Sequence, residues 1–394
     1  HNSATSDAIT THSDGTASAK IADVGGSQLS NRNLQVNGAM IIAQKATTDT
    51  GSEGLATVDK FGLSTSGEDE DLTQEQGDVA SGTTPYTQGF RKTFKLTNGN
   101  QSSGAGAGDT LVILHRVEAQ DLANSGWNYT SASSYVSFSF WVKSSVAQNF
   151  YVTFKSGDGT PQKYAMETGS LTADTWTKIT KTIPGNSNIQ FDNDNGEGLE
   201  IEWSIFRGTD ETGSMSLNAW AANNNSVRTP DQPVSWFQQN GATFELTGIQ
   251  LEVGEQATPF EHRSFSDELN RCSRYLQIFH VPTSDSKRAS NITATVHGTG
   301  GGVYLNVAFI HPMRAAPSVT VDGAFGGNVF TGSWSGATLS SITAEYGTDA
   351  LSTLGFHGIT SASVTGSHTT GLTGQIYTAN NGSNDAALIY SAEL

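Results

Sequence analysis

The sequence predicts an all-β protein with a jelly-roll β-sandwich, a short linking helix and a second β-sandwich. Three observations predict this fold class. Gly makes up 43 of the 394 residues, and Ser, Thr and Asn are frequent throughout, which is typical of many short strands joined by turns. Apolar residues alternate with polar ones in several segments. One stretch near residue 270 instead carries them at helical spacing.

The first thirty residues are expected to form a stalk or linker. Residues 1–30 contain no Phe, Trp or Tyr and consist mostly of small and polar residues, so they cannot bury enough apolar surface to fold alone. The chain also begins with His1, which suggests a fragment or a processed product. We expect this segment to be ordered only by packing against other chains.

Residues 31–262 are predicted to form the first sandwich. The segment SYVSFSFWVKS (134–144) places Val136, Phe138 and Phe140 on one face and polar residues mainly on the other. LEIEWSIF (199–206) does the same, with Glu200, Glu202 and Ser204 on the polar face. Period two with one polar face indicates antiparallel sheets that are wet on one side. TLVILHRVE, NFYVTFK, TWTKITKTI and ATFELTGIQLEV have the same pattern.

Residues 263–280 are predicted to form the linking helix. Its apolar stripe consists of Phe265, Leu269, Cys272, Leu276 and Phe279. Ser264 and Asp267 make a weak capping box, and Pro282 would end the helix. This helix could couple two sandwiches rigidly, or its stripe could form the seam of a three-helix cluster. Cys272 is the one cysteine, so no intrachain disulfide is possible, and it is interpreted as a small core residue.

Residues 281–394 are predicted to form the second sandwich, with strands in GGVYLNVAFIHPM and APSVTV. This region has few charged residues, so part of its surface is expected to be covered by other chains. Together with the extended first segment, it predicts a homotrimer.

The charge and hydropathy of the chain exclude two kinds of partner. The formal net charge is −17, which repels phosphate backbones and argues against nucleic acid. No apolar run approaches the ~18 residues that a membrane span requires, so membrane insertion is not expected.

Several segments in fixed order carry a resemblance. NRNLQVNGAMIIAQ, TVDKF, FSFWVKS, LTADTWTKIT, FDNDNGEGLEIEW and FELTGIQLEVGEQATPFEHRSFSDELNRCSRYLQ span residues 31–277. This series resembles a recurrent region of bacteriophage tail-fibre proteins, common among marine and cyanobacterial phages. The final IYSAEL also resembles the ending of such fibres.

The resemblance implies a trimeric virion fibre that carries a carbohydrate-binding-like jelly roll and a C-terminal tip that contacts the host. Its expected partners are other virion tail proteins and a host surface glycan, outside the cell. It carries over no catalytic residue. The first hypothesis is therefore non-catalytic receptor binding. A fibre-borne polysaccharide depolymerase and a structural head or tail appendage without its own receptor are the alternatives.

Four aromatic residues in polar, loop-like settings are candidate glycan contacts: Trp127, Tyr129, Trp220 and Trp236. Sugar rings stack their C–H face on aromatic rings while Asn, Asp and Gln bind the hydroxyls. Because a jelly roll also buries tryptophans at its rims, a core role is the alternative for each residue.

FDNDNGEGLE contains a candidate cation site made of Asp192, Asp194, Asn195 and Glu197. Alternating carboxylates around a Gly turn suit Ca²⁺, which would be the cofactor here. The run falls short of an EF-hand loop because Trp203 stands at the twelfth position. A solvated turn is the alternative.

Enzymatic motifs are weak in this sequence. It contains no HExxH, no clustered Cys and His, and no GxSxG. The chain is therefore expected not to be an enzyme. Carboxylate pairs for glycoside hydrolysis stay open, because acidic residues are plentiful and their separation in space is not visible in the sequence.

Overall fold

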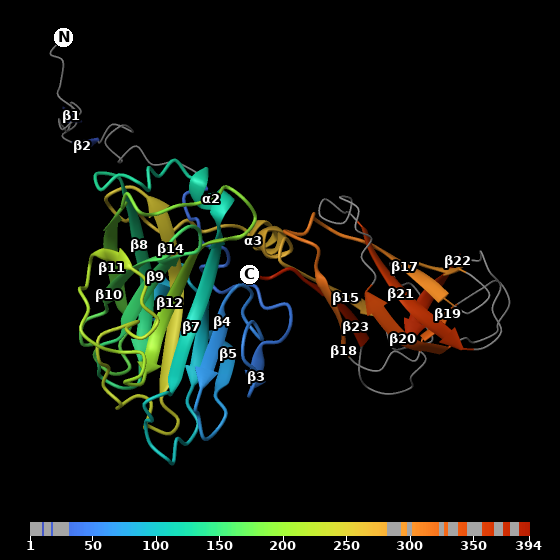
Figure 1. Ribbon diagram of the computed structural model, residues 1–394, viewed down its shortest axis with the longest axis horizontal. Coiled ribbons are helices and arrows are strands. Elements are labelled where there is room, and N and C mark those ends of the chain that lie inside the picture. The colour runs from blue at the N-terminus through green and yellow to red at the C-terminus, as the bar shows by residue number, and fades with distance from the viewer. Residues whose placement is uncertain are drawn as a thin grey trace, which may run out of the picture. The chain divides into compact units, whose positions relative to one another are not determined.

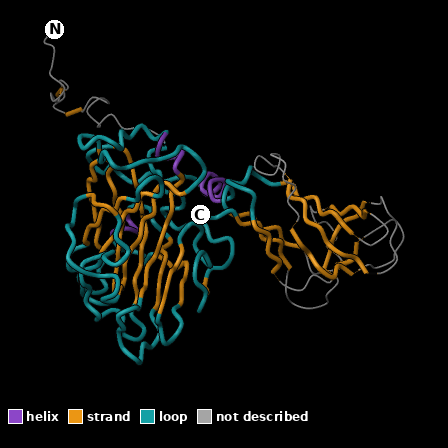
Figure 2. Tube along the Cα trace, viewed as in Figure 1, coloured by secondary structure: helices purple, strands orange, loops and turns teal. Residues whose placement is uncertain are grey.

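In the computed structural model nearly every regular element is a strand, as the sequence predicts (Figures 1 and 2). The structure describes residues 10–11, 17–18, 31–281, 293–297, 302–322, 327–329, 338–344, 357–365, 373–378 and 386–394. The chain divides into two units, His1–Phe265 and Ser266–Leu394. Apart from the short strands β1 (Thr10–Thr11) and β2 (Ala17–Ser18), the predicted stalk lies outside the described residues.

The first unit is a sandwich of two six-stranded antiparallel sheets. The first sheet has the order β13-β10-β9-β12-β7-β4, which places β12 between β9 and β7 (Figure 1). Its strands are β4 (Gly62–Ser66), β7 (Thr110–Glu118), β9 (Tyr151–Ser156), β10 (Gln162–Glu167), β12 (Glu197–Arg207) and β13 (Trp220–Ala222).

The second sheet has the order β11-β8-β14-β6-β5-β3. Its strands are β3 (Thr48–Thr50), β5 (Thr73–Asp78), β6 (Lys92–Thr97), β8 (Tyr135–Ser144), β11 (Thr177–Pro184) and β14 (Thr243–Val253). Two short helices, α1 (Thr84–Thr87) and α2 (Ala119–Ala123), join strands of this unit.

The core lies between the two sheets and follows the alternation of their strands. Phe138 of β8 contacts Phe154 of β9 and Trp203 of β12, with ring centroids 5.0 and 5.9 Å apart. Trp203 is 1% exposed, and its neighbours on β12 point the other way. The apolar residues of period two therefore form one continuous core, and the polar residues form the outer face of each sheet.

An irregular segment at residues 33–38 continues the second sheet. β14 pairs with β6 only over Thr243–Leu246. Further along β14, the Leu34 N–H donates to the Leu251 carbonyl (2.8 Å) and the Ile249 N–H donates to the Gly38 carbonyl (2.9 Å). The Asn33 side chain adds hydrogen bonds to the backbone of the same two β14 residues. Residues 33–38 thus take the place of β6 beside the second half of β14.

The predicted helix over residues 263–280 is wrong in its second half. α3 spans Phe265–Cys272, and β15 follows at Leu276–Val281. Leu276 pairs with Ser391 and Phe279 with Leu388 of β23 (Ala386–Ser391), so both lie on a strand. The segment LQIFHV satisfies strand alternation as well as helical spacing, and the backbone pairing with β23 decides between them. At the other end of the predicted stripe, Phe265 is 60% exposed.

In its described residues the second unit is also all-β apart from α3. β15, β23 and β18 (Ser318–Asp322) form a three-stranded sheet. Where the sequence predicts a second sandwich, the other strands close into a barrel with the order β16-β17-β21-β20-β19-β22. They are β16 (Thr293–His297), β17 (Gly302–Ala308), β19 (Gly327–Val329), β20 (Thr338–Ala344), β21 (His357–Thr365) and β22 (Thr373–Thr378). Closure pairs every one of these strands on both sides and removes the open edges that a sandwich leaves.

None of the helices in the described ranges is long and apolar enough to cross a membrane.

Candidate functional site

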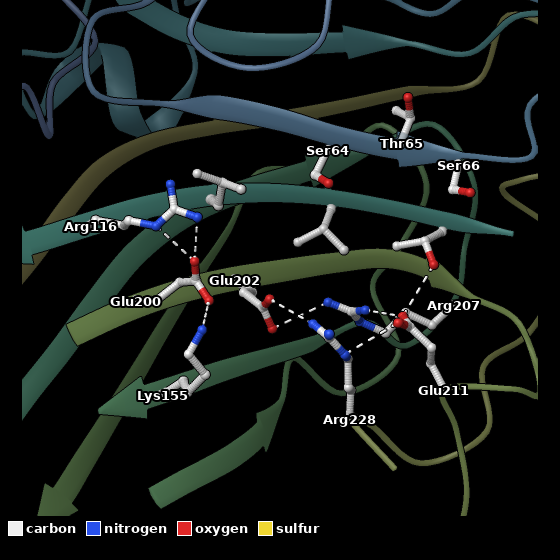
Figure 3. Close-up of a pocket in the computed structure, with 13 residues that line it drawn as sticks. Ser64, Thr65, Ser66, Arg116, Lys155, Glu200, Glu202, Arg207, Glu211 and Arg228 are labelled. Atoms are coloured by element: carbon white, nitrogen blue, oxygen red, sulfur yellow. Dashed lines mark hydrogen bonds and ion pairs between the residues drawn. The ribbon is translucent and has the colours of Figure 1, made fainter. Parts of the chain in front are cut away.

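A groove on the outer face of the first sheet gathers most of the charged side chains of that face (Figure 3). Its volume is about 380 Å³, within the usual size range of small ligand pockets. It lies over β4, β7, β12 and β9 and reaches the chain after β12. The lining residues are Ser64, Thr65, Ser66, Thr110, Val112, Leu114, Arg116, Lys155, Glu200, Glu202, Arg207, Glu211 and Arg228.

One end of the groove is built by cross-strand neighbours around Glu200. The antiparallel register places Glu200 of β12 opposite Arg116 of β7 on one side and Lys155 of β9 on the other. The Arg116 Nη2 lies 2.6 Å and the Lys155 Nζ 2.5 Å from the Glu200 carboxylate. Partial burial opposes the charge on Lys155, but the hydrogen bond and the charge of Glu200 outweigh it and raise the pKa of Lys155.

Glu197 contacts the same two cations beside the groove. The Arg116 Nε lies 2.7 Å and the Lys155 Nζ 3.7 Å from its carboxylate. Burial and the nearby charge of Glu200 nevertheless raise the pKa of Glu197 above its usual value.

The other end of the groove is a buried charge network around Glu202. The Thr153 hydroxyl donates to this carboxylate at 2.8 Å, and Arg207 Nη2 and Lys163 Nζ lie 3.2 and 3.7 Å away. Burial acts to raise the pKa of Glu202, but the positive charges of Arg207 and Lys163 outweigh it and lower the pKa to about 2. Burial also lowers the pKa of Lys163 to about 8, against the opposing charge of Glu202.

The segment that follows β12 adds Glu211 and Arg228 to this end. Arg207 forms an ion pair with Glu211, and the Thr110 hydroxyl donates to the same carboxylate at 3.1 Å. Arg228 Nε lies 3.3 Å from Glu211 and Arg228 Nη1 lies 3.6 Å from Glu202. The Arg228 backbone N–H donates to the Glu211 carbonyl at 2.7 Å, which holds this segment beside the groove.

The groove therefore offers fixed donors and acceptors on a rigid sheet. Hydroxyls of Ser64 and Ser66 on β4 lie across from the charged side chains (Figure 3). Val112 and Leu114 supply an apolar strip between the two sets. Such a surface can bind a flexible polar ligand through hydrogen bonds without first having to order its own side chains.

The four aromatic candidates lie away from this groove, and two of them are core residues. Trp127 is 3% exposed and donates its indole N–H to the Ser134 carbonyl. Trp236 is fully buried and donates to the Thr243 carbonyl. Both belong to the buried core cluster of the sandwich, which agrees with the core alternative for each residue.

Tyr129 and Trp220 are partly buried. The Tyr129 ring lies edge-on to Phe191 with centroids 4.6 Å apart, and it contacts Trp127 at 6.3 Å. Trp220, on β13, packs on Tyr164 and donates its indole N–H to the Pro184 carbonyl at 2.7 Å. Of the four residues, Trp127 and Tyr129 are the two whose rings are in contact with each other.

The candidate cation residues are spread between a turn and an ion pair. Asp192 accepts from Gln190, and Asp194 accepts from the Gly196 N–H within its own turn. Asn195 is half-buried in the same turn, while Glu197 pairs with the cations beside the groove. Among the described residues no group of three or more His, Cys, Asp or Glu side chains is placed to hold a metal ion. The predicted Ca²⁺ site has no support from this geometry.

Sequence reasoning assigns Glu200 and Glu202 to the polar face of their strand but does not select them as a site. Arg116, Lys155 and Arg228 come from separate segments. The signal that could have selected them is the presence of charged residues on the polar faces of three strands otherwise rich in apolar residues. Only the order of the strands in the sheet shows that these charges meet.

No protein-family model matches the chain, and no curated protein matches it. Solved structures similar to it include the enzymatically active domain of tailspike protein 4 of bacteriophage CBA120, with 9% identity and a TM-score of 0.30 over 56% of this chain. The chain spans only 21% of that tailspike domain.

Two further similar structures are sugar-binding proteins by their descriptions. A putative sugar-binding protein from Bacteroides thetaiotaomicron has 10% identity and a TM-score of 0.32, over 56% of this chain and all of the other. A family 11 carbohydrate-binding module from Clostridium thermocellum has 12% identity and a TM-score of 0.24, over 53% of this chain and 98% of the other.

Proposed function

We propose that this protein is a virion fibre subunit that binds a host surface glycan without cleaving it, and that the groove over β7, β12 and β9 holds the glycan. The observation that carries the proposal is the groove itself, with its ordered rows of charged and hydroxyl side chains around an apolar strip. Sugars present many hydroxyls together with an apolar C–H face, so they are matched by this combination. The resemblance of residues 31–277 to phage tail fibres supports the fibre role.

Blocking the groove should abolish glycan binding. Ser64 is half-buried on β4, and its side chain points toward the charged row (Figure 3). A Ser64→Trp variant would fill the groove with an indole and should lose binding on a glycan array. Thr180→Trp, on exposed β11 of the opposite sheet, is the matched control and should bind as the parent does. Unchanged binding by Ser64→Trp would exclude the groove as the binding site.

The depolymerase alternative has one observation in its favour. Glu197 has a raised pKa and lies beside the Glu200 carboxylate, with Arg116 contacting both. A carboxyl group with a raised pKa, paired with a second carboxylate, is the arrangement that glycoside hydrolysis uses. We expect the polysaccharide that binds on the array to keep its chain length after long incubation. Shortening that is lost in Glu197→Gln would establish the depolymerase instead.

A trimeric fibre predicts a particular mass in solution. Light scattering at micromolar concentration should give three times the 41.6 kDa of one chain. Three weak sites in one particle bind a surface far better than one, so the trimer should also adhere to a glycan-coated surface more strongly than any single site binds free glycan. A mass of one chain would contradict the trimer. A protein that neither adheres to the coated surface nor binds free glycan would favour a purely structural appendage.

A further inference from the structure

The charges of the groove are arranged by depth. The side chains of Arg116, Lys155 and Arg228 are 25%, 26% and 26% exposed. The carboxylates that they contact are deeper, since Glu200 is 6% and Glu202 7% exposed. The carboxylates therefore act as buried counter-ions beneath the cations, and a ligand entering the groove meets mainly the cations.

Glu211 and Glu197 are the exceptions, at 26% and 27% exposure. Arg207 and the Thr110 hydroxyl engage Glu211, and Arg116 and Lys155 engage Glu197. The water-facing side of the groove, with Glu197 beside it, thus carries three cations and two carboxylates. This local excess of positive charge lies on a chain whose net charge is −17. A nearby anion is drawn to the groove by these close cations, because charges farther than about 10 Å away are largely screened by salt.

Among the partly exposed cations of the groove, Arg228 has the longest contacts with carboxylates. Its contacts with Glu211 and Glu202, at 3.3 and 3.6 Å, are ion pairs and not hydrogen bonds. Its Nε is buried against Glu211, so a ligand would meet the terminal nitrogens of the guanidinium. Lys155, by contrast, donates to Glu200 at 2.5 Å. The planar guanidinium is also suited to a carboxylate or sulfate, because it can donate two parallel hydrogen bonds to either.

We infer that the groove selects sugar units that carry an anionic group, a carboxylate or a sulfate, and that Arg228 contacts that group. The inference rests on the proposed function, since it names the class of glycan for the same groove. The backbone hydrogen bond from Arg228 to Glu211 and the bridge between Thr212 and Thr229 hold the Arg228 backbone beside the groove.

The test compares three polymers that separate charge from sugar: dextran, dextran sulfate and polygalacturonic acid. Binding to the whole chain is measured by calorimetry at about 0.02 M and about 0.2 M salt, where screening differs strongly. The two anionic polymers should bind, more weakly at the higher salt, and dextran should bind at least tenfold more weakly, since it lacks the charged contact that is worth about that factor.

Arg228→Gln should weaken binding of the anionic polymers by about tenfold or more and leave dextran unchanged. Lys178→Gln, an exposed cation on β11 of the other sheet, is the matched control and should change nothing. Lys155→Gln is the second variant, because Arg116 still neutralises Glu200 when Lys155 is removed, and it should weaken the same polymers.

The possible failures can be told apart. One set of results would overturn the charge inference and leave the proposed function standing. In that set, dextran binds as tightly as the anionic polymers, Arg228→Gln has no effect on binding, and Ser64→Trp still abolishes binding. If Lys178→Gln weakens binding as much as Arg228→Gln, the attraction is not specific to the groove and the inference is overturned. If no polymer and no glycan on the array binds, both fail together.

Discussion

Glu202→Ala should lower the free energy of unfolding by about 3–5 kcal/mol, the usual cost of leaving a buried charge without its partner. Arg207 and Lys163 are 2% and 3% exposed at their side chains, and Glu202 is the carboxylate between them. Urea denaturation measures the loss. Asp78→Ala is the matched control, because its ion pair with Lys92 is mostly exposed and should be worth less than about 1 kcal/mol. A loss for Glu202→Ala as small as that of the control would contradict this account of the network.

The same carboxylate should dominate the acid limb of the stability curve. Its pKa is about 2 when folded against 4.5 for an unperturbed Glu. Because the folded pKa is the lower one, the stabilisation is complete above about pH 4.5 and is lost as the pH falls toward 2. Lys163, with its pKa near 8, stays protonated throughout this window. Glu202→Gln should flatten the pH dependence between these values in urea titrations.

Trp236→Ala should destabilise the sandwich by about 3–5 kcal/mol, as expected for a large side chain removed from a packed core. Trp236 is fully buried, and its indole N–H donates a hydrogen bond to the Thr243 carbonyl. The matched variant Trp220→Ala removes a partly buried indole and should cost clearly less. Thermal or urea unfolding of the two variants compares them directly. If Trp236→Ala kept the parent stability but lost glycan binding, Trp236 would be a ligand contact after all.

The sequence predicts most of the strands well but not the groove. The alternation of apolar with mainly polar residues locates β8 and β12, and it is visible within a few residues. Both faces of these strands are buried, however, so the polar face that the sequence assigns to water is covered. The groove instead depends on register between strands far apart in the chain. Glu200 meets Arg116 and Lys155 only because β12 lies between β7 and β9, an order that the local pattern does not contain.

The errors have the same origin. The segment after Cys272 fits a helix and a strand equally well, and its partner strand lies more than a hundred residues later, at Ala386–Ser391. Trp127 and Trp236 have polar neighbours in the sequence, but the structure buries both side chains in the core. Polar neighbours in the chain therefore say little about burial where the backbone turns back on itself.

The segment at residues 33–38 limits how far the chain can be truncated from its N-terminal end. It supplies the backbone partners of Ile249 and Leu251 on a strand in the interior of its sheet. A shortened chain that kept every sandwich strand but began after residue 44 would expose an open row of amides and carbonyls along β14. Such a row is a template for pairing with other chains, so the shortened protein would be prone to aggregate even though it kept every sandwich strand.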